Sequence, residues 1–338
     1  MIFFDTTKTG AAGHRSGLTR VSARLRDELG AGATPVAWDE AAARAQPADW
    51  FLTTELFSGD ERPGFPAFLA ARPCRLAAVF HDAIPLKHPH ITWPQSVARH
   101  PAYLKLLAKF DRVWAVSAAS RDELLGYWRW LGLEDAPPVE VLALGADFHR
   151  QPRATARAAP RAARLLSVGI LEPRKNQSLL LEACEELWAG GLDFELHLVG
   201  RVNPRFGRPI VERIRALRRT RGASLHFHEA ADDATLAELF ATARATLFPT
   251  LAEGCGLPLL ESLWQGVPCV CSDLPVLREN ASGGGCLPVA PGDHGAWRDA
   301  LRRILTDDAL CTRLGSEAAV RPLPTWRESA ATLARALA

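Results

Sequence analysis

ATLFPTLAEGCGLPLLESLWQG, residues 245–266, contains a complete strand-to-helix unit. The opening run ATLFPT is short and apolar, as expected of a buried strand, and LPLLESLWQG has the pattern of a helix that Gly266 ends. In the turn between them, Gly254 and Gly256 allow the backbone to approach a ligand closely because neither carries a Cβ. The free N–H groups of residues 254–257 then lie at a helix N-terminus, which predicts a binding site for an anion such as phosphate.

Two carboxylates bracket this turn. Glu253 precedes the helix and Glu261 lies about one turn inside it. A nucleotide-sugar carries its sugar and its ribose at opposite ends of a diphosphate, so two acceptors that flank a phosphate site match such a ligand. From these residues alone, a strand-to-helix turn with two solvated glutamates is the alternative.

Strand and helix patterns alternate along the whole chain. Helical patterns include 97–110, 120–132 with Ser120 and Glu123 in capping-box spacing, and 233–243. Short apolar runs predict strands at 2–4, 35–38, 50–54, 76–80, 113–117, 139–144, 164–169, 194–200, 224–229, 245–250, 268–272 and 286–290. Continuous apolar strands that alternate with helices predict α/β domains with parallel sheets covered on both faces.

A segment without periodicity divides the chain. Residues 151–162 are rich in Arg, Ala and Pro and are predicted to be a linker. It separates a Rossmann-like domain at 1–150 from a second one at 163–320, and 321–338 forms a terminal helix that returns to the first domain. The expected architecture is two such domains facing each other across a cleft, with ligands at the carboxyl ends of the strands.

Composition excludes several classes of function. Of 338 residues, 48% are hydrophobic and 23% charged, and the net charge of +2 gives no global reason to expect nucleic-acid binding. The start MIFFDTTKTG has no basic segment followed by a long apolar one, and no run has the roughly 18 to 20 apolar residues of a membrane span. Seven cysteines without CxxC spacing are a poor disulfide framework, which favours a reduced, cytoplasmic setting.

The turn and its surroundings resemble a known family. Two glutamates that bracket seven residues are the signature of retaining glycosyltransferases of the GT-B fold, family 4, also called group 1. The segments that follow this pattern are 248–281, 167–184, 79–89 and 110–124, and PTWRESAATLARAL (324–337) resembles the family's terminal helix. The resemblance covers most of the chain, and is strongest over 164–291 and weakest over 22–74.

The resemblance implies roles for the bracketing residues. Glu261 matches the glutamate that binds the ribose hydroxyls of the donor, and Glu253 matches the one that contacts the transferred sugar. The backbone beside it is that of Gly254, Cys255, Gly256 and Leu257. Cys255 stands where an aromatic residue is common, and Glu229 stands where glycine is common near the base, so the resemblance does not define the base.

Arg174 and Lys175, in EPRKN, match the cations that neutralise the donor diphosphate. Many relatives carry an additional arginine where this chain has Ile170, so Arg174 and Lys175 are expected to carry nearly all of the side-chain compensation. Charge grows on the departing diphosphate, so fixed cations there stabilise the transition state. The alternative for the pair is a solvated loop.

The first domain contributes three further candidates. His81 matches a histidine that hydrogen-bonds the donor sugar, against the alternative of a structural histidine at the end of a strand. Asp82 either orients His81 or caps the following turn. Gly17 and Arg20 lie in a segment that resembles the family's glycine-containing loop near the phosphate and the acceptor, although such loops serve many nucleotide binders.

Trp128 and Trp130 lie together on one predicted helix. They are expected to pack in the core, and a membrane interface is the alternative because acceptors in this family can be lipid-linked. No Asp-x-Asp motif lies at a strand end, and Asp232 with Asp233 is interpreted as a helix cap, so neither a metal nor another cofactor is expected.

The sequence therefore predicts a cytoplasmic, retaining, metal-independent glycosyltransferase of the hexosyltransferase type. Its partners are a nucleotide-sugar donor and a glycan, lipid-linked or small-molecule acceptor, with peripheral contact to the inner face of the membrane as an option and no nucleic acid. The alternatives are a sugar-nucleotide epimerase or phosphorylase on the same fold, and a non-catalytic GT-B partner subunit.

Overall fold

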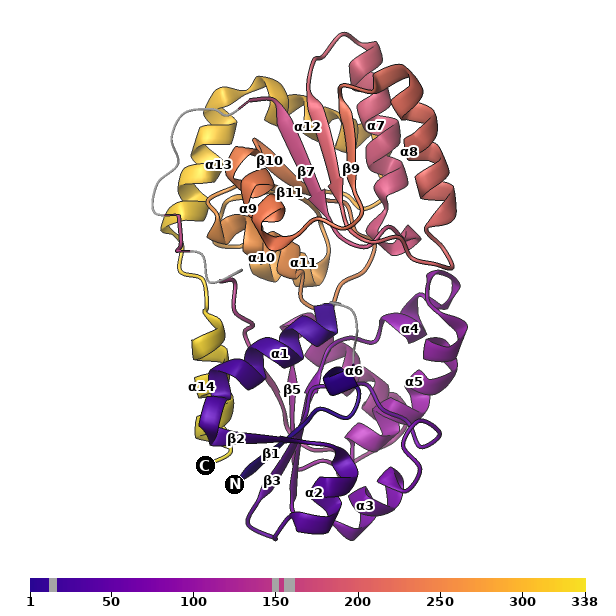
Figure 1. Cartoon of the computed structure of the whole chain (residues 1–338), viewed down its shortest axis with the longest axis vertical. Helices are drawn as coiled ribbons and strands as arrows, with labels where there is room; N and C mark the ends of the chain where they lie inside the picture. The colour runs from indigo at the N-terminus through magenta and orange to yellow at the C-terminus, as the bar shows by residue number, and fades with distance from the viewer. Residues whose placement is uncertain (12–16, 148–151, 155–161) are drawn as a thin grey trace. The chain divides into compact units, whose positions relative to one another are not determined.

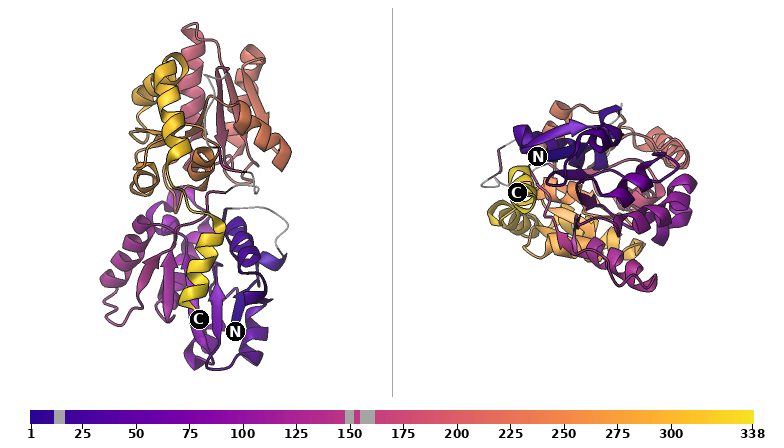
Figure 2. Two further views of the ribbon diagram at one scale, coloured as in Figure 1. Left: turned by 90° about the vertical axis from the view of Figure 1, so that its left-hand side faces the viewer. Right: turned by 90° about the horizontal axis from the view of Figure 1, so that it is seen from below.

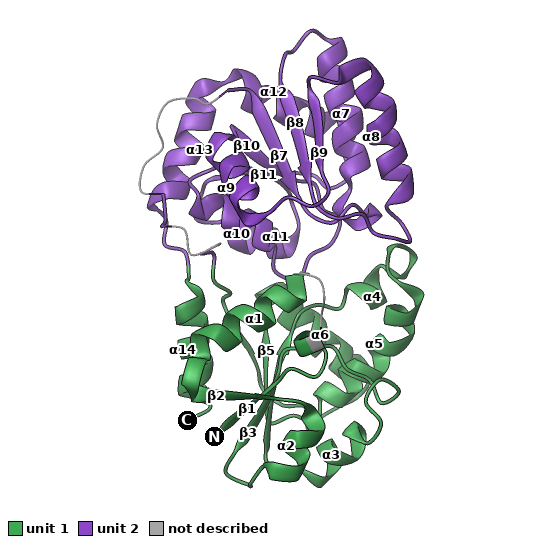
Figure 3. Ribbon diagram, in the orientation of Figure 1, with its two compact units in different colours: residues 1–145, 324–338 green, residues 146–323 purple. Residues whose placement is uncertain are grey.

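The computed structural model describes residues 1–11, 17–147, 152–154 and 162–338. The chain forms two compact units, which Figure 3 shows in different colours. Unit 1 consists of Met1–Gly145 and Pro324–Ala338, and unit 2 consists of Ala146–Leu323. Much of the predicted linker at 151–162 lies outside the described residues.

Unit 1 is built around a parallel sheet with the strand order β2-β1-β3-β4-β5-β6. Its strands are β1 (Ile2–Asp5), β2 (Ala33–Val36), β3 (Trp50–Thr53), β4 (Arg75–Phe80), β5 (Arg112–Ala115) and β6 (Val139–Val141). Its helices are α1 (Gly17–Leu29), α2 (Trp38–Arg44), α3 (Phe65–Ala71), α4 (Ile84–Lys87), α5 (Pro94–Leu107), α6 (Ala118–Trp130) and α14 (Trp326–Ala336). The apolar strand residues are buried because helices cover the sheet, as expected for parallel strands.

Helix α14 is the last element of the chain and packs beside α1 in unit 1. Its N-terminus has the capping box in which Thr325 and Glu328 bond each other's backbone N–H groups. Ser329 on this helix donates to the backbone oxygen of Ala143 at 2.7 Å. The two ends of the described chain therefore lie close together in unit 1, as both views of Figure 2 show.

Unit 2 contains a second parallel sheet with the order β12-β11-β10-β7-β8-β9. Its strands are β7 (Arg164–Val168), β8 (Glu195–Val199), β9 (Leu225–His228), β10 (Ala245–Phe248), β11 (Cys269–Ser272) and β12 (Cys286–Val289). Its helices are α7 (Gln177–Ala189), α8 (Arg208–Arg221), α9 (Asp233–Thr242), α10 (Leu257–Trp264), α11 (Pro275–Ala281), α12 (His294–Thr306) and α13 (Asp308–Val320).

The two faces of this sheet have different cores. The larger core joins the strands to α7, α8 and α12 and contains, for example, Leu196, Leu198 and Trp297. A smaller core on the other face joins Leu166 and Val199 to α9. In Figure 1, α7 and α8 accordingly lie to one side of β7 and β9 and α9 to the other. Successive strand residues point to opposite faces, so this arrangement fixes where every side chain of β8 and β9 points.

The fold class predicted from the sequence is confirmed, since two α/β units with parallel sheets are present. Each predicted apolar run is a strand, within two residues at its start and three at its end. The predicted capping box at Ser120 is wrong. The N-cap of α6 is Ser117, whose side chain accepts from Ser120 N at 3.0 Å, and Glu123 instead forms an ion pair with Lys87.

Asp232 caps α9 as predicted, because its side chain accepts from Thr235 N at 2.8 Å. The two tryptophans of α6 differ. Trp128 is buried and donates to Leu104 O at 2.8 Å, whereas Trp130 is 78% exposed, so the expectation of a core position is wrong for Trp130. Among the described residues, no helix has both the length and the apolar composition needed to cross a membrane.

Candidate functional site

Two loops at the carboxyl edge of the unit 2 sheet meet at the predicted site. After β7 the chain forms a short 3-10 turn, Pro173–Lys175, and after β10 it forms the turn that leads into α10. The backbone oxygen of Arg174 accepts from Leu251 N at 2.8 Å and from the Thr250 hydroxyl at 3.1 Å. The paired strands β7 and β10 thus bring Arg174 and Lys175 next to Glu253 although 78 residues separate Lys175 from it.

Glu253 is the centre of this cluster. Its Oε1 accepts from the Thr250 hydroxyl at 2.7 Å and from Arg174 Nη1 at 3.1 Å, and it also forms an ion pair with Lys175 Nζ. Burial raises the pKa of Glu253, but the charges of Lys175 and Arg174 outweigh burial and hold this pKa below its ordinary value. Glu253 is therefore an ionised carboxylate that is almost excluded from solvent, since its side chain is only 9% exposed.

The guanidinium of Arg174 is occupied by protein acceptors. Nε and Nη2 bind Glu172 Oε1 at 3.0 and 2.9 Å, and Nη1 binds both Ala252 O at 2.9 Å and Glu253. The other carboxylate oxygen of Glu172 accepts from Asn203 at 2.9 Å. Arg174 consequently ties the loop after β7 to the loop after β10, and its planar fork suits this bridging contact.

Lys175 reaches the same carboxylate as a compact ammonium. Its Nζ lies 4.9 Å from the centre of the Phe248 ring, which places the charge over an aromatic face. The side chain is 11% exposed. Burial lowers the pKa of Lys175, and Arg174 adds to this effect while Glu253 opposes it. Because the ammonium of Lys175 is largely desolvated, it interacts more strongly with a bound anion than an exposed lysine would.

The turn before α10 has the backbone geometry expected from its glycines. Gly256 is the N-cap of α10 with φ of +85°, and an added Cβ would lie 2.5 Å from Leu277 Cδ2. Asn280 donates to the backbone oxygen of Cys255 at 2.5 Å and holds the turn against α11. Burial raises the pKa of the Cys255 thiol to about 12, with Glu253 adding to the shift, so this thiol is not a nucleophile at neutral pH.

Glu261 lies on α10 and is 2% exposed. With Glu253 only 9% exposed, the alternative of two solvated glutamates is wrong. Gly254 and Leu257 lie between them, in the turn and at the first position of α10. Glu253, Arg174 and Lys175 are in direct contact, and Gly254, Cys255, Gly256 and Leu257 connect them to the helix that carries Glu261.

The remaining candidates belong to unit 1. His81 follows β4, and its Nε2 lies 2.8 Å from Thr54 O, so Nε2 carries the proton and donates. Burial lowers the pKa of His81, against the opposing effects of Thr54 and Asp82, which favours a neutral ring with Nδ1 as an acceptor. Asp82 caps the following turn, because its Oδ1 accepts from Ile84 N at 3.0 Å.

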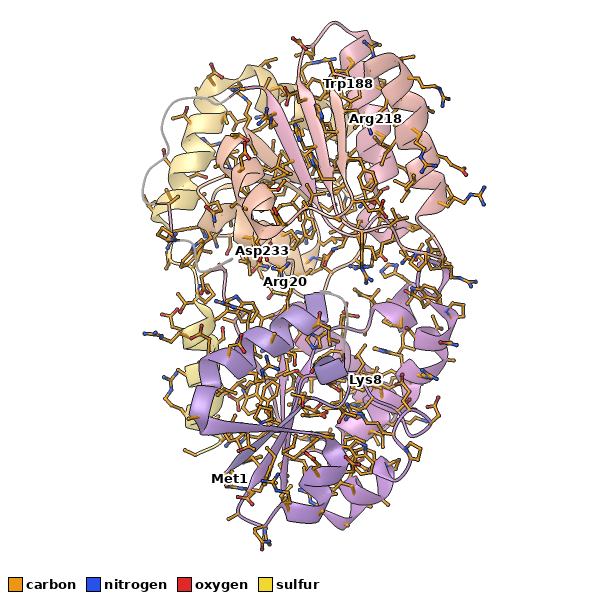
Figure 4. The ribbon with its side chains drawn as sticks, in the orientation of Figure 1. Met1, Lys8, Arg20, Trp188, Arg218 and Asp233 are labelled. Carbon is orange, nitrogen blue, oxygen red and sulfur yellow. The ribbon has the colours of Figure 1, made fainter. Side chains whose placement is uncertain are left out.

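Gly17 begins α1 and Arg20 lies in its first turn, as the label in Figure 4 shows for Arg20. Nothing in the described structure lies within 4 Å of a Cβ added to Gly17. The part of the predicted glycine-containing loop at 12–16 lies outside the described residues.

A buried ion network in unit 1 was not predicted from the sequence. Arg62, itself 1% exposed, donates to Asp5 Oδ2 at 2.8 Å and forms an ion pair with Glu55. Glu55 accepts from the backbone N–H groups of Lys8 and Thr9 at 2.7 to 3.0 Å. The network therefore holds the loop after β1, which carries the Lys8 labelled in Figure 4. Neither periodicity nor a motif distinguishes Arg62 from a surface arginine.

Comparison with known proteins agrees with this architecture. The family model described as "Glycosyl transferases group 1" matches residues 152–321, which are 170 of the 338 residues. The chain is 30% identical over 217 residues to the serotype-specific mannosyltransferase WbdA of Escherichia coli. This similarity covers 60% of the chain but 26% of WbdA, so the chain corresponds to about a quarter of that protein.

Solved structures show the same fold. Sucrose-phosphate synthase from Thermosynechococcus elongatus has a TM-score of 0.69 at 18% identity, covering 99% of this chain and 97% of that one. HepE of Anabaena in complex with UDP has a TM-score of 0.68 at 13% identity, covering 94% of this chain and 93% of that one. The fold is that of two Rossmann-like domains of the GT-B type. The chain belongs to the group 1 glycosyl transferases.

Proposed function

We propose that the chain is a retaining, metal-independent glycosyltransferase that moves a hexose from a nucleotide-sugar to a glycan, lipid-linked or small-molecule acceptor. The observation that carries the proposal is the contact of Glu253 with Lys175 and Arg174 at the N-terminal turn of α10. A carboxylate for the sugar, a cation for the diphosphate and the backbone N–H groups at the start of α10 are then within one small part of unit 2.

Lys175 is the residue that we propose to stabilise the departing diphosphate. It is the only lysine between residues 146 and 323, in a chain in which Lys and Arg together number 40. The ammonium has three donors, so Lys175 can keep its ion pair with Glu253 and also donate to a phosphate oxygen. Because charge accumulates on the leaving group, a fixed ammonium stabilises the transition state more than the bound donor.

Arg174 is better described as a positioning residue than as an equal partner of Lys175. Its contacts to Glu172, Glu253 and the backbone of Ala252 use donors on all three of its nitrogens. For the Arg174 guanidinium to donate to a diphosphate as well, one of these contacts would have to lengthen. Arg174 therefore contributes mainly by fixing the Glu253 carboxylate and the loop in which it lies, and contributes to the diphosphate only through its long-range charge.

The other roles follow from position. On the buried face of α10, Glu261 would accept from the ribose hydroxyls of the donor. His81 would accept a sugar hydroxyl through Nδ1, since Nε2 is used by Thr54 O. Gly17 and Arg20, at the start of α1, would approach the phosphate and the acceptor. Transfer through these groups requires no metal ion.

The donor sugar and the acceptor are proposed from the relatives. WbdA is by name a mannosyltransferase, which makes a mannosyl donor the first candidate. HepE binds UDP in its crystal structure, which keeps uridine among the candidate bases. A cytoplasmic protein that touches the inner face of the membrane would be consistent with Trp130, since an exposed tryptophan suits the headgroup region.

A thermal-shift screen tests the proposal. UDP-, GDP-, ADP- and dTDP-sugars are added to the full chain, and a true donor at about 100 times its dissociation constant should add roughly 2.7 kcal/mol of stability. Product from the identified donor, formed in EDTA, is then examined by early proton NMR. We expect retention of the anomeric configuration. A β-linked product from an α-donor, or no shift with any nucleotide-sugar, would reject the proposed activity.

A further inference from the structure

Three histidines and a glutamate gather on one face of the unit 2 sheet. Glu195 and His197 lie on β8, and His226 and His228 on the neighbouring strand β9, which is at the edge of the sheet. His197 is paired with His226 in the parallel register, so alternation directs all four side chains to the face that carries α9. The opposite face of the same strands belongs to the larger apolar core.

The ligand atoms of this cluster are close together. Glu195, His197 and His226 each offer one oxygen or nitrogen, and these atoms lie within 4.8 Å of one another. His197 Nε2 and Glu195 Oε2 are 2.9 Å apart. Two ligands of a tetrahedral zinc ion, at about 2.0–2.1 Å from the metal, lie roughly 3.3–3.4 Å apart. The three atoms are thus close enough for one cation to gather them, once the nearly parallel rings of His197 and His226 turn so that a nitrogen of each faces the ion.

His228 completes the arrangement as an outer partner. Its Nε2 lies 3.1 Å from His197 Nδ1, on the opposite side of the ring from Glu195. A metal-binding histidine ordinarily donates its second ring N–H to a nearby acceptor, which fixes its orientation. If His197 binds a cation through Nε2, its Nδ1–H can donate to His228. The cation would take the place of the proton on His197 Nε2. Neutral His197 would then carry its proton on Nδ1 and neutral His228 its own on Nδ1, so the two rings change tautomer and release no net proton.

The partial exposure of the cluster suits a site that an ion can reach from solvent better than it suits packing in the core. His197 is buried, but Glu195, His226 and His228 are half-buried, so solvent reaches one side of the cluster. The imidazole rings of His197 and His226 are stacked with centroids 4.4 Å apart. One opposing feature is Arg164, which donates to Glu195 Oε2 at 2.8 Å and places a positive charge beside the carboxylate. We therefore expect a moderate affinity.

We propose that Glu195, His197 and His226 form a binding site for a divalent first-row transition metal such as Zn²⁺, with His228 as the outer partner of His197. Imidazole nitrogen with one carboxylate is a donor set that suits zinc, copper, nickel and iron and disfavours magnesium and calcium. Glu195 begins β8, whereas Lys175 and Glu253 follow the carboxyl ends of β7 and β10. The metal would thus stabilise the β8–β9 edge and take no part in transfer. The sequence predicted no metal anywhere in the chain, and this proposal departs from that expectation.

The test uses the full chain, stripped with EDTA and freed of any histidine tag. Zn²⁺ is titrated by calorimetry and Co²⁺ by visible absorption, and we expect one equivalent of each with nitrogen and oxygen ligands. His226→Asn and Glu195→Gln should each weaken Zn²⁺ binding at least ~10-fold, and His228→Asn about 10–100-fold as the loss of an outer partner. Zn²⁺ should also raise the melting temperature of the wild type but not of His226→Asn.

His294→Asn is the matched control, because His294 is a part-exposed histidine of the same unit beside Glu186. Its Zn²⁺ affinity should equal that of the wild type. Melting in EDTA shows whether each variant is folded, and Glu195→Gln provides a second test if a histidine variant is not. The proposal is overturned if the stripped chain binds no Zn²⁺, if binding survives His226→Asn and Glu195→Gln unchanged, or if the Co²⁺ spectrum shows an intense thiolate band from cysteine ligands.

Discussion

Replacing Lys175 by Met tests whether this lysine acts mainly on turnover or mainly on the stability of the loops around Glu253. Methionine keeps the apolar stem of the side chain and removes the ammonium beside Glu253 and over the Phe248 ring. If Lys175 stabilises the leaving diphosphate, its loss should resemble the loss of one oxyanion donor. We expect turnover at saturating donor to fall about 10²–10³-fold, equivalent to roughly 2.7–4 kcal/mol.

The structural cost of the same change should be smaller. Glu253 keeps Arg174 Nη1 at 3.1 Å and the Thr250 hydroxyl at 2.7 Å, so its charge retains two partners. One charged hydrogen bond is lost, which corresponds to about 1.5–3 kcal/mol of unfolding free energy. Arg174→Met should show the opposite relation between the loss of stability and the loss of turnover. It removes contacts to Glu172, Ala252 and Glu253 together, and should cost more stability and less turnover than Lys175→Met.

The assay measures release of nucleoside diphosphate at saturating donor, well below each variant's melting temperature, with urea unfolding in parallel. Lys87→Met is the control for the loss of a lysine, since Lys87 pairs with Glu123 on the surface of unit 1. Lys175→Arg should restore turnover only partly, because a planar fork does not replace a compact ammonium at a close phosphate contact. Unchanged turnover with only a raised KM for Lys175→Met would show uniform binding and refute the reasoning.

Three further outcomes are expected. Glu261→Ala should weaken donor and free nucleoside diphosphate alike by about 1.5–3 kcal/mol, because ribose contacts persist in both; calorimetry showing normal nucleotide binding would contradict the ribose assignment. Gly145→Ala should lower the melting temperature markedly, because its Cβ would lie 2.2 Å from Trp326 N, whereas Gly17→Ala should not show a steric cost. The nearby cations outweigh burial and hold the folded-state pKa of Glu253 below its ordinary value of 4.5. The stability that Glu253 contributes is therefore complete above pH 4.5, and it is lost as the pH falls through the folded-state pKa. Urea unfolding measured from about pH 6 to 3 should therefore show that the free energy of unfolding falls less steeply below pH 4.5 in Glu253→Gln than in the wild type.

The strands and the turn at 253–257 were predictable because their signals are local. Alternation of short apolar runs with helical patterns places each strand, and glycine is needed where Gly256 adopts φ of +85° against Leu277. The start of α6 was misplaced by three residues because two serines compete as caps. Sequence spacing favours Ser120, but Ser117 is the one with extended backbone angles, which sequence alone does not reveal.

Features that depend on strand register were not predictable. His197 and His226 are 29 positions apart, and only the pairing of β8 with β9 brings them together. The partners of two arginines also depend on the tertiary structure. Arg62 contacts Asp5, 57 positions away, and Arg174 donates to acceptors on two loops. Side-chain charge at these positions is visible in the sequence, but its partners are determined by tertiary structure.

The position of α14 has a consequence for how the chain folds during synthesis. Unit 1 contains the first 145 residues and then Pro324–Ala338, so all of unit 2 is translated before unit 1 is complete. Residues 146–323 are 178 residues, which at ~5–20 residues per second takes roughly 9 to 36 s. During that time the surface of α1 that α14 covers, and the space beside Gly145 that Trp326 fills, are exposed on the nascent chain. Unit 2 can close first, and a ribosome stalled before residue 324 would present a finished unit 2 joined to an unfinished unit 1 that is a substrate for chaperones.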